Sequence, residues 1–343
     1  MNNEAQVLTL NSQEGQALLA GGSRPVVNKR TGDVMLRLGN GMTVNSTLKK
    51  DEWEELDSAV VQAATKPLNV VATLQRLGLV RRLGSIGTLT AQYNKSSEVT
   101  AANRSLTGTT GGAKDLPDYD LVGVPVPVIF KEFEIPMRTL AASRRMGDGL
   151  DLTAAVAAAK VVGESLEDLV ISGDATISLN GGSISGLTSH ADRNTDTATN
   201  YGGGDWGTIA NVVSTISGMI AAAEGDNYFG PYALFVSTTQ YGQASRSFFT
   251  DGSGDTARDR ALRIPQLQLF EAAHWLADGV AVLVNLSRDV IELAYVDAYF
   301  PVVNMEWTSG DGMMTSYKVM SVATPIVKSE YSGKSGIVHC TGA

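Results

Sequence analysis

The histidines and the single cysteine are the side chains of this sequence best suited to catalysis, and none occurs in a catalytic pattern. His190, His274 and His339 lie in unrelated contexts, and none forms the His-Glu-x-x-His arrangement that binds zinc on a helix. Cys340 follows His339 directly, but neighbouring side chains on a strand point to opposite faces. We therefore expect structural histidines, an unreactive cysteine, no catalytic residue and no metal ligand.

Two glycine-rich segments match ligand-binding motifs only in part. Gly333–Gly336 resembles the end of a phosphate-binding loop, but the glycine required five positions earlier is Lys328, and no helix is predicted to follow. Asp251–Asp255 alternates oxygen-bearing side chains as a calcium loop does, but the sixth and twelfth positions are Thr256 and Leu262. We expect no phosphate loop, no calcium site and no cofactor. The chain is therefore not predicted to be an enzyme.

The distribution of charge along the sequence is more informative than any motif. Between Lys66 and Arg104 there are six basic residues and one acidic residue, whereas between Asp148 and Asp174 there are six acidic residues and one basic residue. In an isolated subunit such intervals are ordinary solvated faces. In a repeating assembly, opposite potentials would steer the basic segment of one copy onto the acidic segment of the next.

Composition restricts the class of protein further. The chain has 343 residues, 43% of them hydrophobic and 18% charged, and a formal net charge of −9. A negative protein is not expected to grip nucleic acid backbone as its main task, because that binding needs Lys and Arg. One cysteine cannot form an intrachain disulfide, which fits a reducing compartment. Residues 1–25 lack a secretory signal, and no apolar run reaches the about 18 residues that a membrane helix needs.

Two strand-forming runs flank a long polar stretch. The first covers Thr88–Tyr93 and the second covers Val124–Phe133. The stretch between them, from Asn94 to Leu121, is dominated by small polar residues and has too few apolar side chains to build a core. A two-stranded ribbon is marginal by itself in water. We therefore predict an extended β-ribbon that lies on another copy of the protein.

Two helices stand out by periodicity and by their end signals. The first is predicted at Leu152–Ser172, opened by Asp151 as N-cap and ended by Gly173, with an alanine-rich face that allows close packing. The second is predicted at Trp206–Glu224, opened by Asp205. Helices that alternate with strands predict a central sheet covered by helices.

The remaining elements are shorter or less regular. Gly and polar residues dominate the first 50 positions, which reads as an extended arm. In chain order the sequence predicts a strand at Val34–Leu38, a helix at Lys49–Ala64, a strand at Tyr232–Val236, a helix at Thr238–Arg246, a strand at Val280–Asn285, and strands within Val290–Pro301 and Met313–Val327 with a turn at Ser309–Gly312 between these two.

This order of parts resembles that of the major capsid proteins of tailed bacteriophages with the Hong Kong 97-type fold, and of their cellular relatives, the encapsulins. The most specific residues are Glu167–Gly173, followed after a Gly/Ser-rich link by Gly186–Leu187, which look like the end of the family's spine helix and the turn beyond it. The segment Val290–Val327 resembles its closing strands. The resemblance implies an α+β fold with an N-terminal arm, an extended β-ribbon loop, a spine helix, and peripheral and axial domains.

The same resemblance implies a division of the chain. Residues 1–81 would be the N-terminal arm and residues 82–138 the extended ribbon loop. Residues 139–185 would form the part of the peripheral domain that carries the spine helix, and residues 186–285 the axial domain. Residues 286–343 would return as axial and peripheral strands.

The resemblance also implies a structural function. The subunit would form hexamers and pentamers that tile an icosahedral shell around double-stranded DNA, held without sequence specificity. Its partners would be other copies of itself, with scaffold, portal and decoration proteins as further candidates, and no membrane. It would be assembled in the cytoplasm of a host bacterium and reside in the virion. Some members cross-link a Lys to an Asn of a neighbour, but the sequence identifies no Asn partner, so cross-linking is not assumed.

The residues expected at subunit interfaces come from the ribbon, its flanks and the spine helix. Reversing Arg81 and Arg82 to Glu is predicted to impair assembly, and reversing Glu164 and Glu167 to Lys to restore it in part. The full set is Arg81, Arg82, Tyr93, Lys95, Arg104, Phe130, Phe133, Glu164, Glu167 and Asp168.

Three alternatives remain open at this point. An encapsulin-like compartment would share the fold but hold a cargo enzyme in place of a genome. An enzyme that dimerises through the ribbon would need a pocket with convergent ionisable groups, and the sequence offers no good candidate. A phage tail or decoration protein would form rings, tubes or trimers without a closed shell.

Overall fold

The computed structural model divides the chain into two compact units. It describes residues 24–27, 34–37, 43–44, 50–65, 68–97, 99–107, 111, 114–136, 138, 152–246, 248–249, 254–307 and 314–343. One unit comprises Met1–Ser58, Glu134–Asp151 and Glu306–Ser316, and the other comprises Ala59–Phe133, Leu152–Met305 and Tyr317–Ala343. The predicted turn at Ser309–Gly312 lies outside the described residues.

The smaller unit contains a three-stranded antiparallel sheet and the start of a helix. The sheet has the order β1-β2-β3, with β1 at Arg24–Val27, β2 at Val34–Arg37 and β3 at Thr43–Val44. Helix α2 covers Lys50–Thr65. The strand predicted at Val34–Leu38 and the helix predicted at Lys49–Ala64 are therefore confirmed to within one residue at each end.

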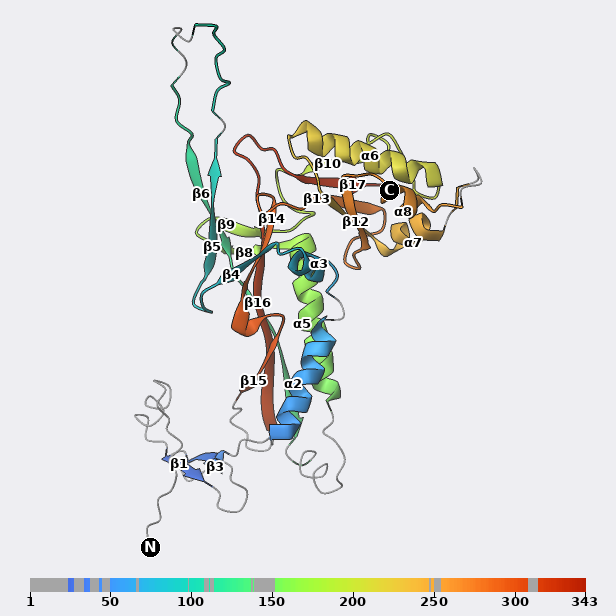
Figure 1. The fold of residues 1–343 in the computed structure, drawn as a ribbon. Coiled ribbons are helices and arrows are strands. Elements are labelled where there is room, and N and C mark those ends of the chain that lie inside the picture. Colours follow the sequence, from blue (N-terminus) through green and yellow to red (C-terminus); the bar gives the residue numbers. More distant parts are fainter. Residues whose placement is uncertain are drawn as a thin grey trace. The chain divides into compact units, whose positions relative to one another are not determined.

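A five-stranded mixed sheet forms one half of the larger unit. Its order is β10-β17-β13-β11-β12, and α6 lies along one side of it (Figure 1). The interior strand β11 is completely buried because it has neighbours on both edges, β13 and β12, and packs on both faces. The elements are β10 (Asn194–Thr197), α6 (Ile209–Gly225), β11 (Tyr232–Val236), α7 (Thr238–Arg246), α8 (Ala257–Ala261), β12 (Leu267–Ala272), β13 (Val280–Asn285) and β17 (Ile337–Thr341).

The predictions for this sheet are confirmed in part. Strands β11 and β13 and helix α7 have the predicted bounds, whereas β12 and β17 were not predicted. Helix α6 begins at Ile209, with Thr208 as N-cap, so the prediction of Asp205 as N-cap is wrong. The Asp205 carboxylate accepts instead from the backbone N–H of Gly207 at 2.8 Å. Trp206 is buried 6.4 Å from the ring of Phe270, because it belongs to the turn that leads into the helix.

A second sheet has the order β15-β16-β14-β4, with β7 paired to β16. The predicted strand at Val124–Phe133 is wrong as a single strand. Pro127 has no N–H to donate, and the chain changes partners there, from the ribbon to β16. The elements are β4 (Val80–Leu83), β7 (Val128–Pro136), β14 (Ile291–Val296), the short 3₁₀ helix Asp297–Tyr299, β15 (Val303–Trp307) and β16 (Met314–Val327).

The long helix α5 covers Thr153–Ser172 and ends where the sequence predicts. Its N-cap position is Leu152, one residue later than predicted, and Asp151 lies outside the described residues. Gly173 has a φ of 71°, and a Cβ at this position would lie 2.4 Å from the backbone N of Gly186. The helix therefore ends at a residue that only glycine fits.

Two short segments connect α5 to its surroundings in the larger unit. Helix α3 covers Val70–Arg76, and a hairpin of β8 (Gly173–Leu179) and β9 (Gly182–Ser185) follows α5. The main buried cluster of this unit combines α3, α5 and both sheets, so these elements share one core. Its representative members are Leu74, Leu166, Val170, Phe235, Val282 and Leu293. No helix in the described part of the chain combines the length and the apolar content needed to cross a membrane.

Candidate assembly interface

The predicted ribbon is present as a pair of antiparallel strands. Strand β5 covers Thr90–Ser96 and β6 covers Tyr119–Pro125, and every residue of one is paired with a residue of the other. The ribbon continues into a connection that projects from the rest of this unit (Figure 1). In this connection Leu106 and Leu116 are 106% and 90% exposed. Large apolar side chains on a two-stranded ribbon are typical of a surface that another molecule covers.

The base of the ribbon packs on the rest of its unit. Ala91 and Val124 are buried, and they belong to a cluster that includes Ile184 of β9 and Ile326 of β16. At Gly182, a Cβ would lie only 1.8 Å from the carbonyl oxygen of Gly123. The turn of the β8–β9 hairpin therefore touches the backbone of β6, which fixes where the ribbon leaves the unit.

Polar contacts reinforce this base. The Lys95 ammonium lies 3.0 Å from Oδ2 of Asp192, and the Ser329 hydroxyl donates to the same oxygen at 2.5 Å. The Tyr93 hydroxyl donates to the backbone carbonyl of Val327 at 3.4 Å. Hydrogen bonds from Ser329 and Lys95 hold the pKa of Asp192 below its usual range. We call Lys95, Asp192 and Ser329 the ribbon latch, since they join β5 to segments that lie far away in the sequence.

Two histidines lie in the larger unit beside the ribbon latch. Burial lowers the pKa of His190 and of His339, which favours the neutral form of both rings. Arg193 donates from Nε to Nδ1 of His339 at 3.3 Å, and Cys340 is buried. Within the described ranges, no three His, Cys, Asp or Glu side chains are grouped so that they could share a metal ion.

Glu167 is not at a surface, so its prediction as an interface residue is wrong. It is fully buried, and its carboxylate accepts hydrogen bonds from the backbone N–H groups of Asn69, Val70 and Val71 at 3.1, 2.6 and 3.2 Å. These groups form the first turn of α3, which needs acceptors because helix ends leave N–H groups unpaired. Burial raises the pKa of Glu167 to about 7, against the lowering effect of the three N–H groups. Glu167 therefore joins α5 to α3 inside one subunit.

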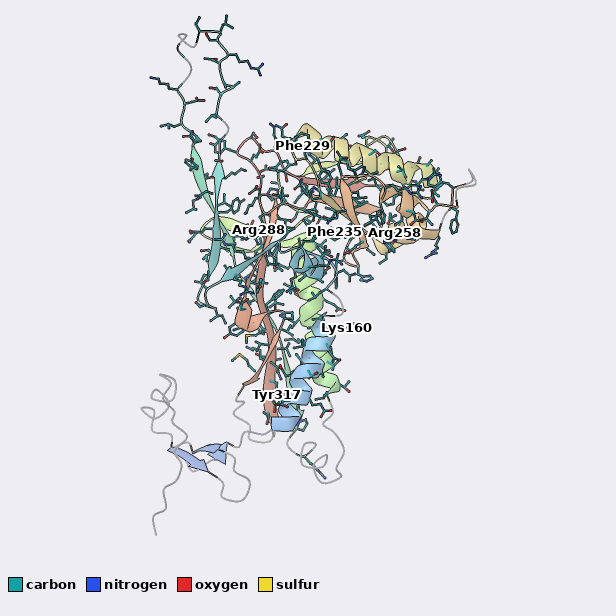
Figure 2. The ribbon with its side chains drawn as sticks, in the orientation of Figure 1. Lys160, Phe229, Phe235, Arg258, Arg288 and Tyr317 are labelled. Carbon is teal, nitrogen blue, oxygen red and sulfur yellow. The ribbon has the colours of Figure 1, made fainter. Side chains whose placement is uncertain are left out.

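The two phenylalanines of β7 that were predicted at an interface differ in exposure. Phe133 is buried and stacks on Tyr317 of β16, the residue labelled in Figure 2, with ring centroids 5.3 Å apart. Its prediction as an interface residue is therefore wrong, because its ring is already covered by its own subunit. Phe130 is 54% exposed, and the ammonium of Lys318 lies 4.4 Å from its ring centroid. Phe130 remains a predicted interface residue.

The other predicted residues are exposed or partly exposed, and several already have partners within the subunit. Arg81 donates to the carbonyl of Gln92 at 2.8 Å, and Arg82 lies 3.5 Å from Asp297. Glu164 lies 3.5 Å from Lys160 of the same helix. Asp168 accepts from the Ser172 hydroxyl at 2.8 Å, and Arg104 is exposed. Their roles between subunits stay predictions.

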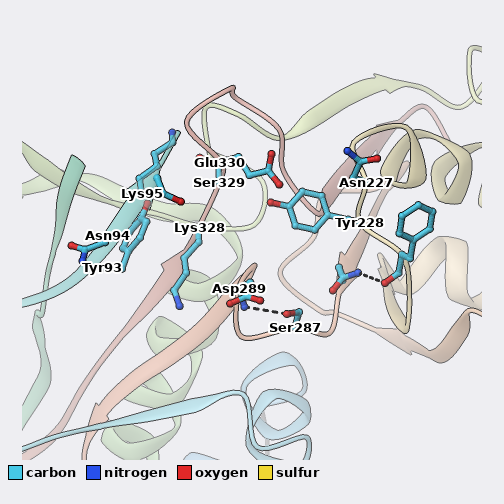
Figure 3. A pocket seen from close by; sticks show the side chains of 13 residues that line it. Tyr93, Asn94, Lys95, Asn227, Tyr228, Ser287, Asp289, Lys328, Ser329 and Glu330 are labelled. Atoms are coloured by element: carbon cyan, nitrogen blue, oxygen red, sulfur yellow. Dashed lines mark hydrogen bonds between the residues drawn. The ribbon is translucent and has the colours of Figure 1, made fainter. Parts of the chain in front are cut away.

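A groove of about 670 Å³ runs beside the base of the ribbon (Figure 3). Strand β5 forms one wall, and Tyr228 and Asn227, which follow α6, form the opposite wall. Asp289 and Glu330 line it as well, and the Asn285 side chain donates to the carbonyl of Phe229 at 3.0 Å. This groove mixes both signs of charge and has no arrangement of nucleophile, base and oxyanion donor.

Asp192 and Ser329 were missed by the sequence-based prediction. Lys95 lies 97 positions from Asp192, and Ser329 lies 137 positions from it. A polar loop and a strand end carry them, and nothing in the local pattern marks either residue. Only the tertiary packing of β5, the segment after β16 and the segment after β9 brings the three together.

Comparison with solved structures shows the fold. A virus-like particle of Pyrococcus furiosus superimposes with a TM-score of 0.59 at 13% identity, covering 84% of this chain and 98% of the other. The capsid of Myoviridae Phage XM1 does so with a TM-score of 0.56 at 16% identity, covering 79% and 92%. The chain has the Hong Kong 97-type fold, as predicted, with a mixed α+β architecture.

Comparison of sequences adds a relative and a family. The type 1 encapsulin shell protein EncA of Myxococcus xanthus (strain DK1622) is 26% identical over 247 residues, which is 72% of this chain and 80% of that protein. A family of unknown function, DUF6260, matches residues 42–340, which is most of the chain. This protein belongs to the family of unknown function DUF6260.

Proposed function

We propose that this protein is a shell-forming structural subunit, and specifically the major capsid subunit of a tailed bacteriophage. The observation that carries the proposal is the ribbon: a two-stranded element with exposed leucines at its end, on a subunit with the fold of capsid and shell proteins. Such a ribbon needs a surface to cover it, and neighbouring copies supply one in a repeating assembly.

The proposed mechanism is geometric. Copies associate into hexamers and pentamers, and each ribbon lies over a neighbouring copy. Many weak contacts then add up to a stable closed shell. Opposite charges on the ribbon flank and on α5 would guide the register of neighbouring copies more than they would raise affinity. A net charge of −9 suits a container that must not hold packaged double-stranded DNA tightly.

The same proposal divides the chain into five parts. These are the arm (1–81), the ribbon loop (82–138), the part of the peripheral domain that carries the spine helix (139–185), the axial domain (186–285) and the return strands (286–343). The sheet around β11 supports an axial domain that also takes β17 from the return strands. Helix α3 and strand β4 pack with α5 and β14, so the last part of the proposed arm would belong to the core of the larger unit.

An encapsulin-like compartment is the second candidate, favoured by the 26% identity to a bacterial encapsulin shell protein. The two candidates share the fold and differ in contents: double-stranded DNA in a virion, with scaffold, portal and decoration proteins as further partners, or a cargo enzyme in a bacterial cytoplasm. Neither assigns catalysis to this chain.

Light scattering coupled to size-exclusion chromatography tests both steps of the proposal. Native particles of megadalton mass are expected, and a monomer or dimer under all assembly conditions would refute shell formation. The ratio of absorbance at nucleic acid and protein wavelengths then separates the candidates. Nuclease-protected double-stranded DNA supports the capsid, whereas a co-purifying protein cargo without nucleic acid supports the encapsulin-like compartment.

A further inference from the structure

A second hollow of about 560 Å³ lies in the larger unit, away from the ribbon. Helix α3 forms one side with Asn69, Thr73 and Arg76, and strand β12 contributes Glu271. The opposite side carries Arg258 at the start of α8, which Figure 2 labels. A hollow of this volume is within the range of ligand pockets, and neither the proposed function nor the comparisons assign it a role.

Arg258 is the side chain that points to a ligand. Its Nε atom is buried and has no hydrogen-bond acceptor among the described residues. Its guanidinium carbon lies 5.7 Å from the centroid of the Tyr241 ring, a contact that holds the group in place without accepting its N–H hydrogens. No hydrogen bond joins the Nε atom to the neighbouring Asp259, whose Oδ2 accepts from the backbone N–H and the hydroxyl of Thr256. A buried N–H without an acceptor is costly, so an outside acceptor is expected there.

The acid in the hollow is already neutralised. Glu271 accepts from Arg76 at 2.8 Å through one oxygen and from the Thr73 hydroxyl at 2.6 Å through the other. Arg76 is 59% exposed, and the pair with Glu271 uses only one of its nitrogens. The Asn69 side-chain amide donates to the carbonyl of Ala272 at 3.1 Å. Among the side chains that line the hollow, two guanidinium groups and one paired carboxylate leave one positive charge in excess.

We propose that this hollow binds a phosphate group, with Arg258 as the main ligand and Arg76 as a second donor. Guanidinium groups present planar pairs of N–H donors that match the oxygens of a phosphate. The chain carries a net charge of −9, so a positive hollow is a local exception that selects anions. The phosphate belongs either to free inorganic phosphate or to a nucleotide chain, and the two sources share this chemistry.

Calorimetric titration of the purified protein at low salt tests the site with inorganic phosphate, with a short single-stranded oligonucleotide, and with acetate. Wild type is expected to bind phosphate saturably and acetate more weakly. Arg258→Gln is expected to lose at least about tenfold in phosphate affinity. Arg258→Lys keeps the charge but not the planar pair of N–H donors, so its phosphate affinity should lie between those of wild type and Arg258→Gln.

Arg104→Gln is the matched control, because it removes the same charge from an exposed position on the ribbon. Its affinity should equal that of wild type. Oligonucleotide binding that also depends on Arg258 would identify nucleic acid as the source, and phosphate binding alone would identify the free ion. The proposal is overturned if wild type binds neither, if Arg258→Gln binds as wild type does, or if Arg104→Gln weakens binding equally. If Arg258→Gln fails to fold, two other measurements test the proposal. Arg258→Lys should bind phosphate more weakly than wild type, and the thermal unfolding midpoint of wild type should be higher in phosphate than in chloride.

Discussion

Removing the carboxylate of Glu167 should strongly destabilise the subunit, although this acid lies on the helix α5 among other acids. In Glu167→Ala, three backbone N–H groups at the start of α3 lose their acceptor at 2.6 to 3.2 Å. A buried donor left without an acceptor costs about 1–3 kcal/mol, but such costs are not additive, so we expect a loss of about 3–5 kcal/mol in the free energy of unfolding. This is a large part of the stability of an ordinary domain.

The same side chain should make stability depend on pH. Burial raises the pKa of Glu167 from 4.5 to about 7, so the folded state holds a proton that the unfolded state has lost. The contribution is therefore fully present below pH 4.5 and is lost as the pH rises through about 7. The shift corresponds to about 3 kcal/mol at most. Glu167→Gln removes this titration, so wild type should lose stability from pH 5 to pH 8 more steeply than the Gln variant.

Chemical unfolding monitored by tryptophan fluorescence, at pH 5, 6, 7 and 8 and in one assembly state, measures both effects. Glu164→Gln is the control, because Glu164 lies on the same helix in a partly exposed pair with Lys160 and should cost less than about 1 kcal/mol. Hydrogen exchange at the amides of Val70 and Val71 gives a local readout, which should accelerate in the Ala variant. Two results would refute the reasoning. One is an equal pH dependence of the free energy of unfolding in Glu167→Gln and Glu164→Gln, and the other is a loss of stability below about 1 kcal/mol in Glu167→Ala.

Three further changes test the ribbon and its surroundings. Arg82→Glu breaks an exposed pair with Asp297 at 3.5 Å, which should leave the fold of the subunit intact, but it should lower assembly yield by light scattering; normal assembly would contradict charge steering. Asp192→Asn should weaken the ribbon latch by about 1 kcal/mol and speed hydrogen exchange in β5, and unchanged exchange would show that the latch does not hold the ribbon. Gly182→Ala places a Cβ 1.8 Å from the carbonyl oxygen of Gly123 and should lower the free energy of unfolding by about 2 kcal/mol or more. Gly123→Ala is the control, because a Cβ there has no atom within 4 Å, and it should leave the free energy of unfolding almost unchanged. Similar losses of stability in both variants would argue against the close contact.

Local signals predicted the elements of this fold well. Three features could be predicted because each depends on neighbouring residues in the sequence. They are the end of α5 at Gly173, the buried strand β11 and the two strands of the ribbon. Predictions failed where tertiary pairing intervened. Pro127 splits a run that looks continuous, because its two halves pair with different partners. Asp205 has the right chemistry for an N-cap but forms a turn before α6.

The candidate site was less predictable than the fold. Arg104 in the connection of the ribbon and Phe130 on β7 are exposed, and their interface roles stay predictions, but Glu167 and Phe133 were misplaced. Both residues fit a surface by type alone: an acid among acids, and an aromatic on a strand. Their burial depends on α3 and on Tyr317, which lie far away along the chain.

The sequence by itself determined the main helices, several of the strands, and the presence of a long polar segment between two strands, and it contains no recognisable catalytic pattern. These properties follow from residue type and short-range spacing. Only the tertiary structure decided which distant groups meet: Glu167 with the first turn of α3, Lys95 with Asp192, and Arg258 with the hollow beside Arg76. The physical reason is that such pairs depend on how whole elements pack, and a side chain's local sequence carries no information about a partner about a hundred residues away.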